Sequence, residues 1–273
     1  MPPDFEYTRP EPDALLLSIH RRAGDADIYF ITNQRNRAEN VSVRLRVDNK
    51  EAELWHADNG AIEPAEYSIA GGLTTVPLHL EARESVFVVL RKPASSPSRA
   101  LPQETVATLA TLSGPWDVAF PPNLGAPPQL RLEKLASWTA QADDGVKYFS
   151  GTATYAKDVQ APQSWFQSGA RILLDLGEVL DIAQVSVNGE ASQILWKAPY
   201  KLDVTGILKP GSNRLEIKVT NQWTNRILGD QALPADKKIL TPPPATGMRM
   251  RGPSQPAESG LIGPVTLSSA AMK

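Results

Sequence analysis

Residues 41–47 have the sequence Val-Ser-Val-Arg-Leu-Arg-Val, in which apolar and polar side chains alternate without interruption. Residues 214–219, Arg-Leu-Glu-Ile-Lys-Val, repeat this alternation in the second half of the chain. Successive side chains of a β-strand point to opposite faces of the sheet, so such alternation predicts a strand with one buried and one solvated face. Both segments are therefore predicted to be half-buried strands.

Shorter runs of the same kind occur along the whole chain, separated by turn-forming residues. These runs are residues 27–32, 75–80, 85–90, 151–155, 171–176 and 183–187. Asp-Asn-Gly at 58–60 and Asn-Gly at 188–189 favour tight turns between strands. The best helical candidate, residues 104–112, is short and rich in threonine. Many short strands with regular turns predict an all-β fold built from sandwiches or barrels.

The chain length of 273 residues predicts two domains, because one domain usually holds about 100–200 residues. Residues 92–103 are rich in proline and serine and lack a hydrophobic period, as is typical of a linker. We predict a β-sandwich over residues 1–95 with a proline-rich lead-in, a linker over 96–105, and a second domain over 106–273. Residues 233–258 are irregular and proline-rich, which predicts either a functional surface loop or disorder.

Composition narrows the classes of partner and cofactor. A net charge of −2 offers no electrostatic basis for binding nucleic acid or an anionic membrane. There are no cysteines, and His20, His56 and His79 lie far apart, so neither a metal site nor any other cofactor is expected, and nothing in the sequence supports a structural Ca²⁺ ion. No apolar run approaches the roughly 20 residues of a membrane span. The N-terminus lacks the pattern of a secretory signal, and no compartment is predicted.

Six motifs of the second domain carry a family resemblance. They are Gly-Val-Lys-Tyr-Phe-Ser-Gly-Thr-Ala-Thr-Tyr at 145–155, the run from Leu174 to Gly189, the run from Leu195 to Tyr200, the run from Asp203 to Gly211, the run from Leu215 to Asp230, and Ser-Gly-Leu-Ile-Gly-Pro at 259–264. In this order they resemble the C-terminal region of family 106 α-L-rhamnosidases. They are more loosely similar to the galactose-binding-like domain of family 2 β-glycosidases. The resemblance implies that the second domain is a galactose-binding-like jelly roll that recognises sugars.

The first domain extends the resemblance over nearly the whole chain. His-Arg-Arg at 20–22, Ala-Asp-Ile-Tyr-Phe-Ile-Thr-Asn at 26–33 and Glu-Leu-Trp at 53–55 resemble the β-domain that follows the catalytic barrel of those rhamnosidases. In that family, whose members are often exported or periplasmic, the barrel that carries catalysis precedes this region. The resemblance therefore implies ancestry and sugar recognition without an intact active site.

The main candidate site is the segment 221–230. An aromatic face can stack on the apolar C–H face of a sugar, while amide and charged groups bind its hydroxyls. Trp223 is the expected stacking residue, and Asn225, Arg226 and Asp230 are the expected hydroxyl partners. The alternative is structural: Arg226 and Asp230 pair with each other, and Trp223 covers an edge of the sandwich.

A second candidate cluster precedes the 145–155 motif. Trp138, Lys147 and Tyr148 are expected to lie beside the first cluster and to contribute to carbohydrate binding. Asp143 and Asp144 belong to the same stretch, where a capped turn is the preferred interpretation. The further aromatic pair of Trp196 and Tyr200 is interpreted as structural. The remaining tryptophans are assigned to cores or edges.

Three functions remain open at this point. The first is a non-catalytic carbohydrate-binding region for plant or bacterial glycans that contain rhamnose or galactose. The second is a small glycoside hydrolase with Asp230 and Glu258 as weak candidate carboxylates, although the sequence shows no paired-carboxylate signature. The third is a structural fragment of a larger glycosidase.

Overall fold

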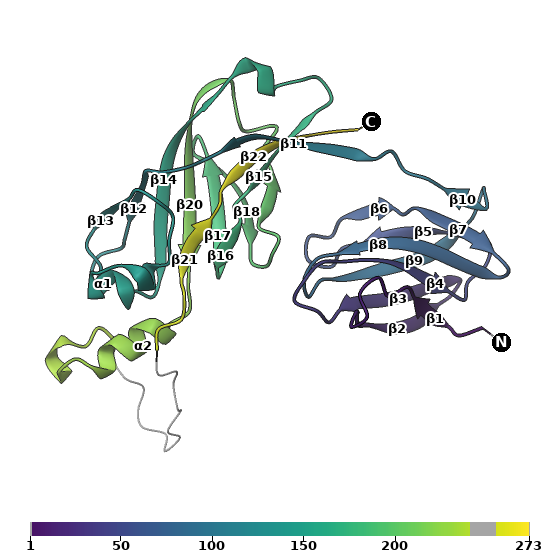
Figure 1. The fold of residues 1–273 in the computed structure, drawn as a ribbon, viewed down its shortest axis with the longest axis horizontal. Coiled ribbons are helices and arrows are strands. Elements are labelled where there is room, and N and C mark those ends of the chain that lie inside the picture. Colours follow the sequence, from purple (N-terminus) through teal and green to yellow (C-terminus); the bar gives the residue numbers. More distant parts are fainter. Residues whose placement is uncertain (1, 241–254, 273) are drawn as a thin grey trace. The chain divides into compact units, whose positions relative to one another are not determined.

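The computed structural model describes residues 2–240 and 255–272, and confirms the predicted all-β fold class. The chain divides into two compact units, residues 1–103 and residues 104–273, which we call unit 1 and unit 2. In the described part of each unit, antiparallel sheets enclose a separate apolar core, so both units are β-sandwiches (Figure 1).

Unit 1 consists of two five-stranded sheets, ordered β1-β4-β8-β7-β10 and β2-β3-β9-β5-β6. The strands are β1 (Phe5–Tyr7), β2 (Leu16–Ala23), β3 (Ala26–Asn33), β4 (Glu39–Leu45), β5 (Lys50–Trp55), β6 (Ile62–Pro64), β7 (Tyr67–Ala70), β8 (Leu73–Leu80), β9 (Ser85–Pro93) and β10 (Ser98–Arg99). The alternation at residues 41–47 has the predicted effect, since Val41, Val43 and Leu45 are buried in the core between the sheets. The burial of β3 alternates in the same way.

The stretch predicted as a linker, residues 96–105, contains regular structure. Strand β10 pairs antiparallel with β7, and the guanidinium of Arg99 lies 5.0 Å from the centre of the Tyr67 ring. Arg99 also forms a 2.8 Å hydrogen bond with the Glu51 carboxylate. These contacts tie part of the proline- and serine-rich stretch to unit 1. The boundary between the two units in the sequence falls after Gln103, and β11 begins at Glu104.

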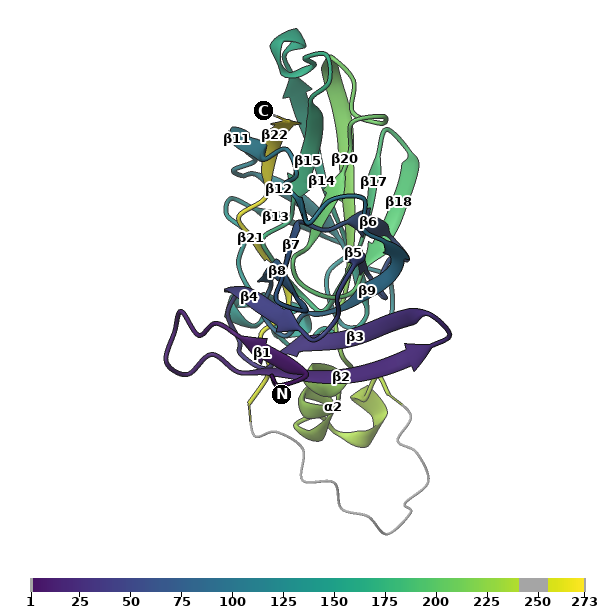
Figure 2. The ribbon, with the colours of Figure 1, turned by 90° about the vertical axis from the view of Figure 1, so that its right-hand side faces the viewer.

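Unit 2 contains a four-stranded sheet, β11-β22-β15-β19, a six-stranded sheet, β13-β12-β14-β20-β17-β18, and a small pair, β16-β21. The strands are β11 (Glu104–Thr111), β12 (Trp116–Ala119), β13 (Gln129–Leu132), β14 (Thr152–Ala161), β15 (Arg171–Asp175), β16 (Glu178–Leu180), β17 (Ile182–Val187), β18 (Glu190–Leu195), β19 (Lys201–Asp203), β20 (Gly211–Thr220), β21 (Gly260–Gly263) and β22 (Thr266–Met272). The long strands β14 and β20 lie side by side (Figure 2).

The helices of unit 2 are short, as the all-β fold class predicts. They are α1 (Asp144–Lys147), α2 (Thr224–Gln231) and the 3₁₀ turns η1 (Trp138–Ala140), η2 (Gln163–Trp165) and η3 (Ala235–Lys237). Helix α2 was not expected, because the best helical candidate in the sequence was residues 104–112. Of the irregular stretch 233–258, residues 241–254 lie outside the described part of the chain.

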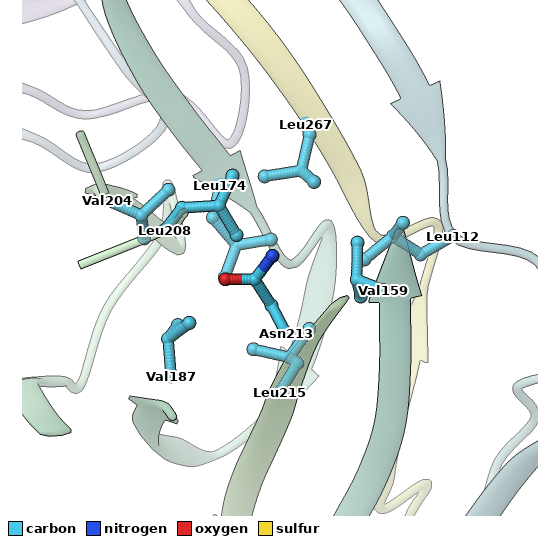
Figure 3. Close-up of a pocket in the computed structure, with 9 residues that line it drawn as sticks. All are labelled: Leu112, Val159, Leu174, Val187, Val204, Leu208, Asn213, Leu215 and Leu267. Carbon is cyan, nitrogen blue, oxygen red and sulfur yellow. The ribbon is translucent and has the colours of Figure 1, made fainter. Parts of the chain in front are cut away.

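The core of unit 2 contains one small void among its tightly packed side chains (Figure 3). Its lining is apolar except for Asn213, whose side-chain amide donates to the carbonyl oxygens of Lys209 and Gly211 at 2.6 and 3.0 Å. The void measures about 10 Å³, which leaves room for at most one water molecule. This void is a packing feature and offers no space for a ligand.

Candidate functional site

The candidate site lies where β20 ends and α2 begins. Asn221 joins this junction to the segment before β14: its Nδ2 donates to the Phe149 carbonyl oxygen at 2.9 Å, and its Oδ1 accepts from the Gly151 amide at 2.9 Å. The Ser150 hydroxyl donates to the Gln222 carbonyl oxygen at 2.8 Å. Segments about 70 residues apart in the sequence are thus held side by side, and both predicted clusters come to the same end of unit 2 (Figure 1).

Arg226 and Asp230 form a buried ion pair within α2. The Arg226 Nε lies 3.0 Å from Asp230 Oδ1, and the two residues are only 3% and 6% exposed. The other oxygen, Asp230 Oδ2, accepts hydrogen bonds from the backbone amides of Ile239 and Leu240 at 3.1 and 2.8 Å. Oδ2 is therefore hydrogen-bonded by the backbone, whereas Oδ1 lies at ion-pair distance from the guanidinium without a hydrogen bond. This geometry agrees with the alternative interpretation of the sequence, in which Arg226 and Asp230 pair with each other.

Asn225 is also engaged by the protein itself. Its Nδ2 donates to the Ala257 carbonyl oxygen at 2.7 Å, and its Oδ1 accepts from the Ala257 amide at 2.8 Å. A further 3.3 Å contact joins Nδ2 to the Ser259 hydroxyl. Asn225 is 2% exposed and anchors the chain that leads into β21. The side-chain amide of Asn225, which was predicted to bind sugar hydroxyls, instead hydrogen-bonds the backbone of Ala257.

Trp138 differs most from its predicted place. It is fully buried, and its ring makes edge contacts with Phe120 and Phe149 and stacks against Tyr155 at a centroid distance of 6.3 Å. The prediction that Trp138 contributes to carbohydrate binding is therefore wrong for this structure, because no face of the indole is accessible. Tight packing of large aromatic rings stabilises the core beneath the candidate site.

Trp223, Lys147 and Tyr148 remain at the surface of this end. Trp223 is 51% exposed and lies at the N-terminus of α2. Lys147 lies with its Nζ 5.4 Å from the centre of the Tyr148 ring, and both side chains are half-buried. We call these three residues the Trp223 surface. Asp143 caps α1 by accepting from the Val146 amide at 3.0 Å, as the capped-turn interpretation predicted.

The two carboxylates named for catalysis are in different environments. Asp230 is buried and pairs with Arg226, whereas Glu258 is exposed. Within the described residues, no group of three or more histidine, aspartate or glutamate side chains is arranged to hold a metal ion. No helix in that same part of the chain is long and apolar enough to cross a membrane.

Unit 1 contains a polar network that the sequence analysis did not predict. The His20 ring lies between two carboxylates, with Nδ1 3.0 Å from Asp4 and Nε2 3.1 Å from Asp27, and stacks on Tyr29 at 4.0 Å. Burial disfavours the ionised form of Asp27, but hydrogen bonds from Lys50 and His20 outweigh it and hold the Asp27 pKa below its usual value. Burial, together with the Asp4 carboxylate, raises the pKa of Tyr29. Asp4, His20, Asp27 and Lys50 line a pocket of about 350 Å³, where they already pair with each other.

Comparisons with known proteins show similarity to parts of glycosidases. Residues 1–69 match the family model of glycoside hydrolase family 106, described as α-L-rhamnosidase. The solved structure of a rhamnosidase from Novosphingobium sp. PP1Y is 42% identical, with a TM-score of 0.87 over 98% of this chain. This chain is related to the family 106 α-L-rhamnosidases. The resemblance inferred from the motifs is confirmed.

A second relative of this rhamnosidase-like chain is a putative β-glucuronidase from Formosa agariphila, 42% identical over 177 residues, or 58% of the chain. The chain spans only 25% of the Novosphingobium rhamnosidase and 15% of the Formosa protein. It therefore corresponds to one region of much longer proteins.

Proposed function

We propose that this rhamnosidase-like chain is a carbohydrate-binding region, that unit 2 is a galactose-binding-like jelly roll, and that the Trp223 surface binds the sugar. The observation that supports this most directly is the half-exposed indole of Trp223, which lies between two hydrogen-bonded residues, Asn221 and Asn225. An exposed tryptophan supplies the flat apolar face on which the C–H face of a pyranose can stack.

The junction is preorganised by the buried residues that follow Trp223. Asn225 is bonded to Ala257, the Arg226 amide donates to the Ser150 hydroxyl at 3.0 Å, and Asp230 bonds two further amides. A ligand that stacks on Trp223 therefore orders little additional chain, which lowers the entropic cost of binding. Lys147 and Tyr148 offer an ammonium donor and a phenolic hydroxyl for sugar hydroxyls.

The expected ligands are oligosaccharides of plant or bacterial glycans that contain rhamnose or galactose. The similarity to a rhamnosidase and to a putative glucuronidase supports carbohydrate as the ligand class. Hydrolysis by this chain alone is not favoured by the geometry, since Asp230 is occupied by Arg226 and two amides. The alternative is a purely structural role, and the binding experiment must distinguish it from carbohydrate binding.

Calorimetric titration with rhamnose- and galactose-containing oligosaccharides at millimolar concentration tests the proposal. Trp223→Ala is expected to weaken binding at least tenfold, because the stacking face is lost. Trp196→Ala is the matched control, since Trp196 is 58% exposed and lies beyond the end of β18. Absence of binding by the folded wild-type protein, or equal losses in the two variants, would reject carbohydrate binding at the Trp223 surface.

A further inference from the structure

The outer face of the six-stranded sheet in unit 2 carries a hollow that no part of the sequence pattern had indicated. It measures about 550 Å³ and lies over β13, β12, β14 and β20. These strands are neighbours in the sheet (Figure 1). We call this feature the sheet hollow. It is separate from the Trp223 surface, because none of the residues that line it belongs to α1 or α2.

The register of the strands explains why the face is hollow there. Ala156 on β14 is paired with Asp117 on one side and with Glu216 on the other. Ala119 on β12 is paired with Thr154 of β14 in the adjacent row. Directly opposed side chains stand about 5 Å apart on one face of a sheet. Two methyl groups therefore form a floor between longer side chains.

The walls carry balanced charge. Arg131 and Arg214 supply two guanidinium groups, and Asp117 and Glu216 supply two carboxylates. The Arg131–Asp117 pair is loose, at 3.6 Å, and both side chains are 63% exposed. Such exposed pairs contribute little to stability and can exchange partners with a ligand at small cost. The lining thus offers donors and acceptors without a net electrostatic preference.

These properties fit one class of ligand better than others. A sugar ring has an apolar C–H face, which matches the alanine floor, and a rim of hydroxyls that both donate and accept, which matches the mixed walls. A polyanion would be attracted by the two guanidinium groups of the lining but repelled by its two carboxylates, and the opposite holds for a polycation. We propose that the sheet hollow is a second carbohydrate site, which binds a neutral oligosaccharide.

This inference extends the proposed function to a surface that the motifs do not include, and it does not depend on the Trp223 surface. Both carbohydrate sites would contact ligand independently, because one is built on helix α2 and the other on the strands of the sheet. Variants at the two places therefore separate the two proposals.

The hollow can be filled without disturbing the core. Ala119 is exposed on β12, and an aromatic residue is well tolerated at such a strand position. Ala119→Phe places a ring on the floor of the sheet hollow. Ala107→Phe is the matched control, because Ala107 is an exposed alanine on β11, a strand of the other sheet. Arg131→Gln is a second variant that keeps the shape of the wall and removes one charged donor.

The test is an NMR titration of backbone amides with a neutral galactose- or rhamnose-containing oligosaccharide. Shifts are expected at β12, β13 and β14, with affinity weakened at least tenfold by Ala119→Phe and several-fold by Arg131→Gln. Trp223→Ala and Ala107→Phe should leave these shifts in place. Shifts confined to α1 and α2, or wild-type affinity in both hollow variants, would overturn the second site and leave the first intact. Chemical-shift changes at the sheet hollow with none at α2 would overturn the Trp223 surface as a sugar site and leave the second site intact.

Discussion

Glu53 of unit 1 and Asp230 of unit 2 are buried carboxylates of comparable exposure, but their partners differ in kind. Glu53 on β5 of unit 1 is 7% exposed and accepts from Lys92 at 2.7 Å, Arg91 at 2.9 Å and the Trp55 indole at 3.1 Å. Both of these cations are themselves about half exposed. Asp230 in unit 2 faces a buried arginine and two backbone amides.

The difference shows what each network does for the protein. The partners of Glu53 come from the adjacent strand β9 and from its own strand, so water can replace them if one is lost. Asp230 instead joins α2 to the segment at Ile239 and Leu240, and its cation, Arg226, is itself buried. We infer that the Glu53 network stabilises a sheet surface, whereas the Asp230 network holds the Trp223 surface in place.

The largest effect is expected from breaking the buried pair. Arg226→Ala leaves the Asp230 carboxylate without its cation and should lower the free energy of unfolding of unit 2 by about 3–5 kcal/mol. Chemical denaturation followed by tryptophan fluorescence measures this loss. Arg214→Ala is the control, because its 3.1 Å pair with Asp158 is exposed and should contribute less than about 1 kcal/mol. Similar losses in the two variants would contradict the distinction between buried and exposed pairs.

A smaller effect is expected from crowding the same network. In a helix, Gly→Ala usually stabilises by about 1 kcal/mol. At Gly229 a β-carbon would lie 2.4 Å from the Arg226 guanidinium and 2.7 Å from Tyr148 Cβ. Gly229→Ala should therefore destabilise unit 2 by about 1–3 kcal/mol, as overpacking does.

Gly206→Ala is the matched control for this substitution, because no heavy atom lies within 4 Å of the added β-carbon. It should be neutral or stabilising by up to about 1 kcal/mol. The melting temperatures of the two variants decide the point: a rise for Gly229→Ala would show that α2 and Tyr148 are not in close contact.

The smallest expected effect is at Glu53 and depends on pH. Burial disfavours the charged form, but hydrogen bonds from Lys92, Arg91 and Trp55 outweigh it and hold the Glu53 pKa at about 2, against an ordinary 4.5. The carboxylate therefore stabilises unit 1 above pH 4.5, and this contribution is lost as the pH falls from 4.5 towards 2. Because the cations are half exposed, the loss should be about 1–2 kcal/mol.

Denaturant midpoints of unit 1 between pH 2 and pH 7 measure this dependence. Glu53→Gln should reduce stability at pH 7 and flatten the profile between pH 2 and pH 4.5. If the stability of this variant depended on pH as steeply as that of the wild type, other carboxylates would account for the acid sensitivity. The ion pairs of Glu53 would then contribute no more than ordinary exposed pairs.

The strands could be predicted from the sequence because their signal is local. Residues 214–219 lie within β20, and Leu215, Ile217 and Val219 are buried as the alternation requires. Helix α2 was missed because its residues include no apolar stripe of helical period, and its stability comes from contacts outside the helix. Ser150 bonds the Arg226 amide and Ala257 bonds Asn225, at separations of 76 and 32 residues.

The sequence by itself determined the all-β class, the buried faces of strictly alternating strands such as β4 and β20, and the relation to rhamnosidases, since alternation and motifs depend on neighbouring residues. It did not predict β11, which is formed by the best helical candidate of the sequence. Only the tertiary structure decided which polar and aromatic groups stay accessible. Trp138 and Trp223 are chemically equal in the sequence, yet one is enclosed by three aromatic rings and the other is half exposed. The sheet hollow likewise exists because cross-strand register, which the sequence does not display, sets Ala156 between Asp117 and Glu216.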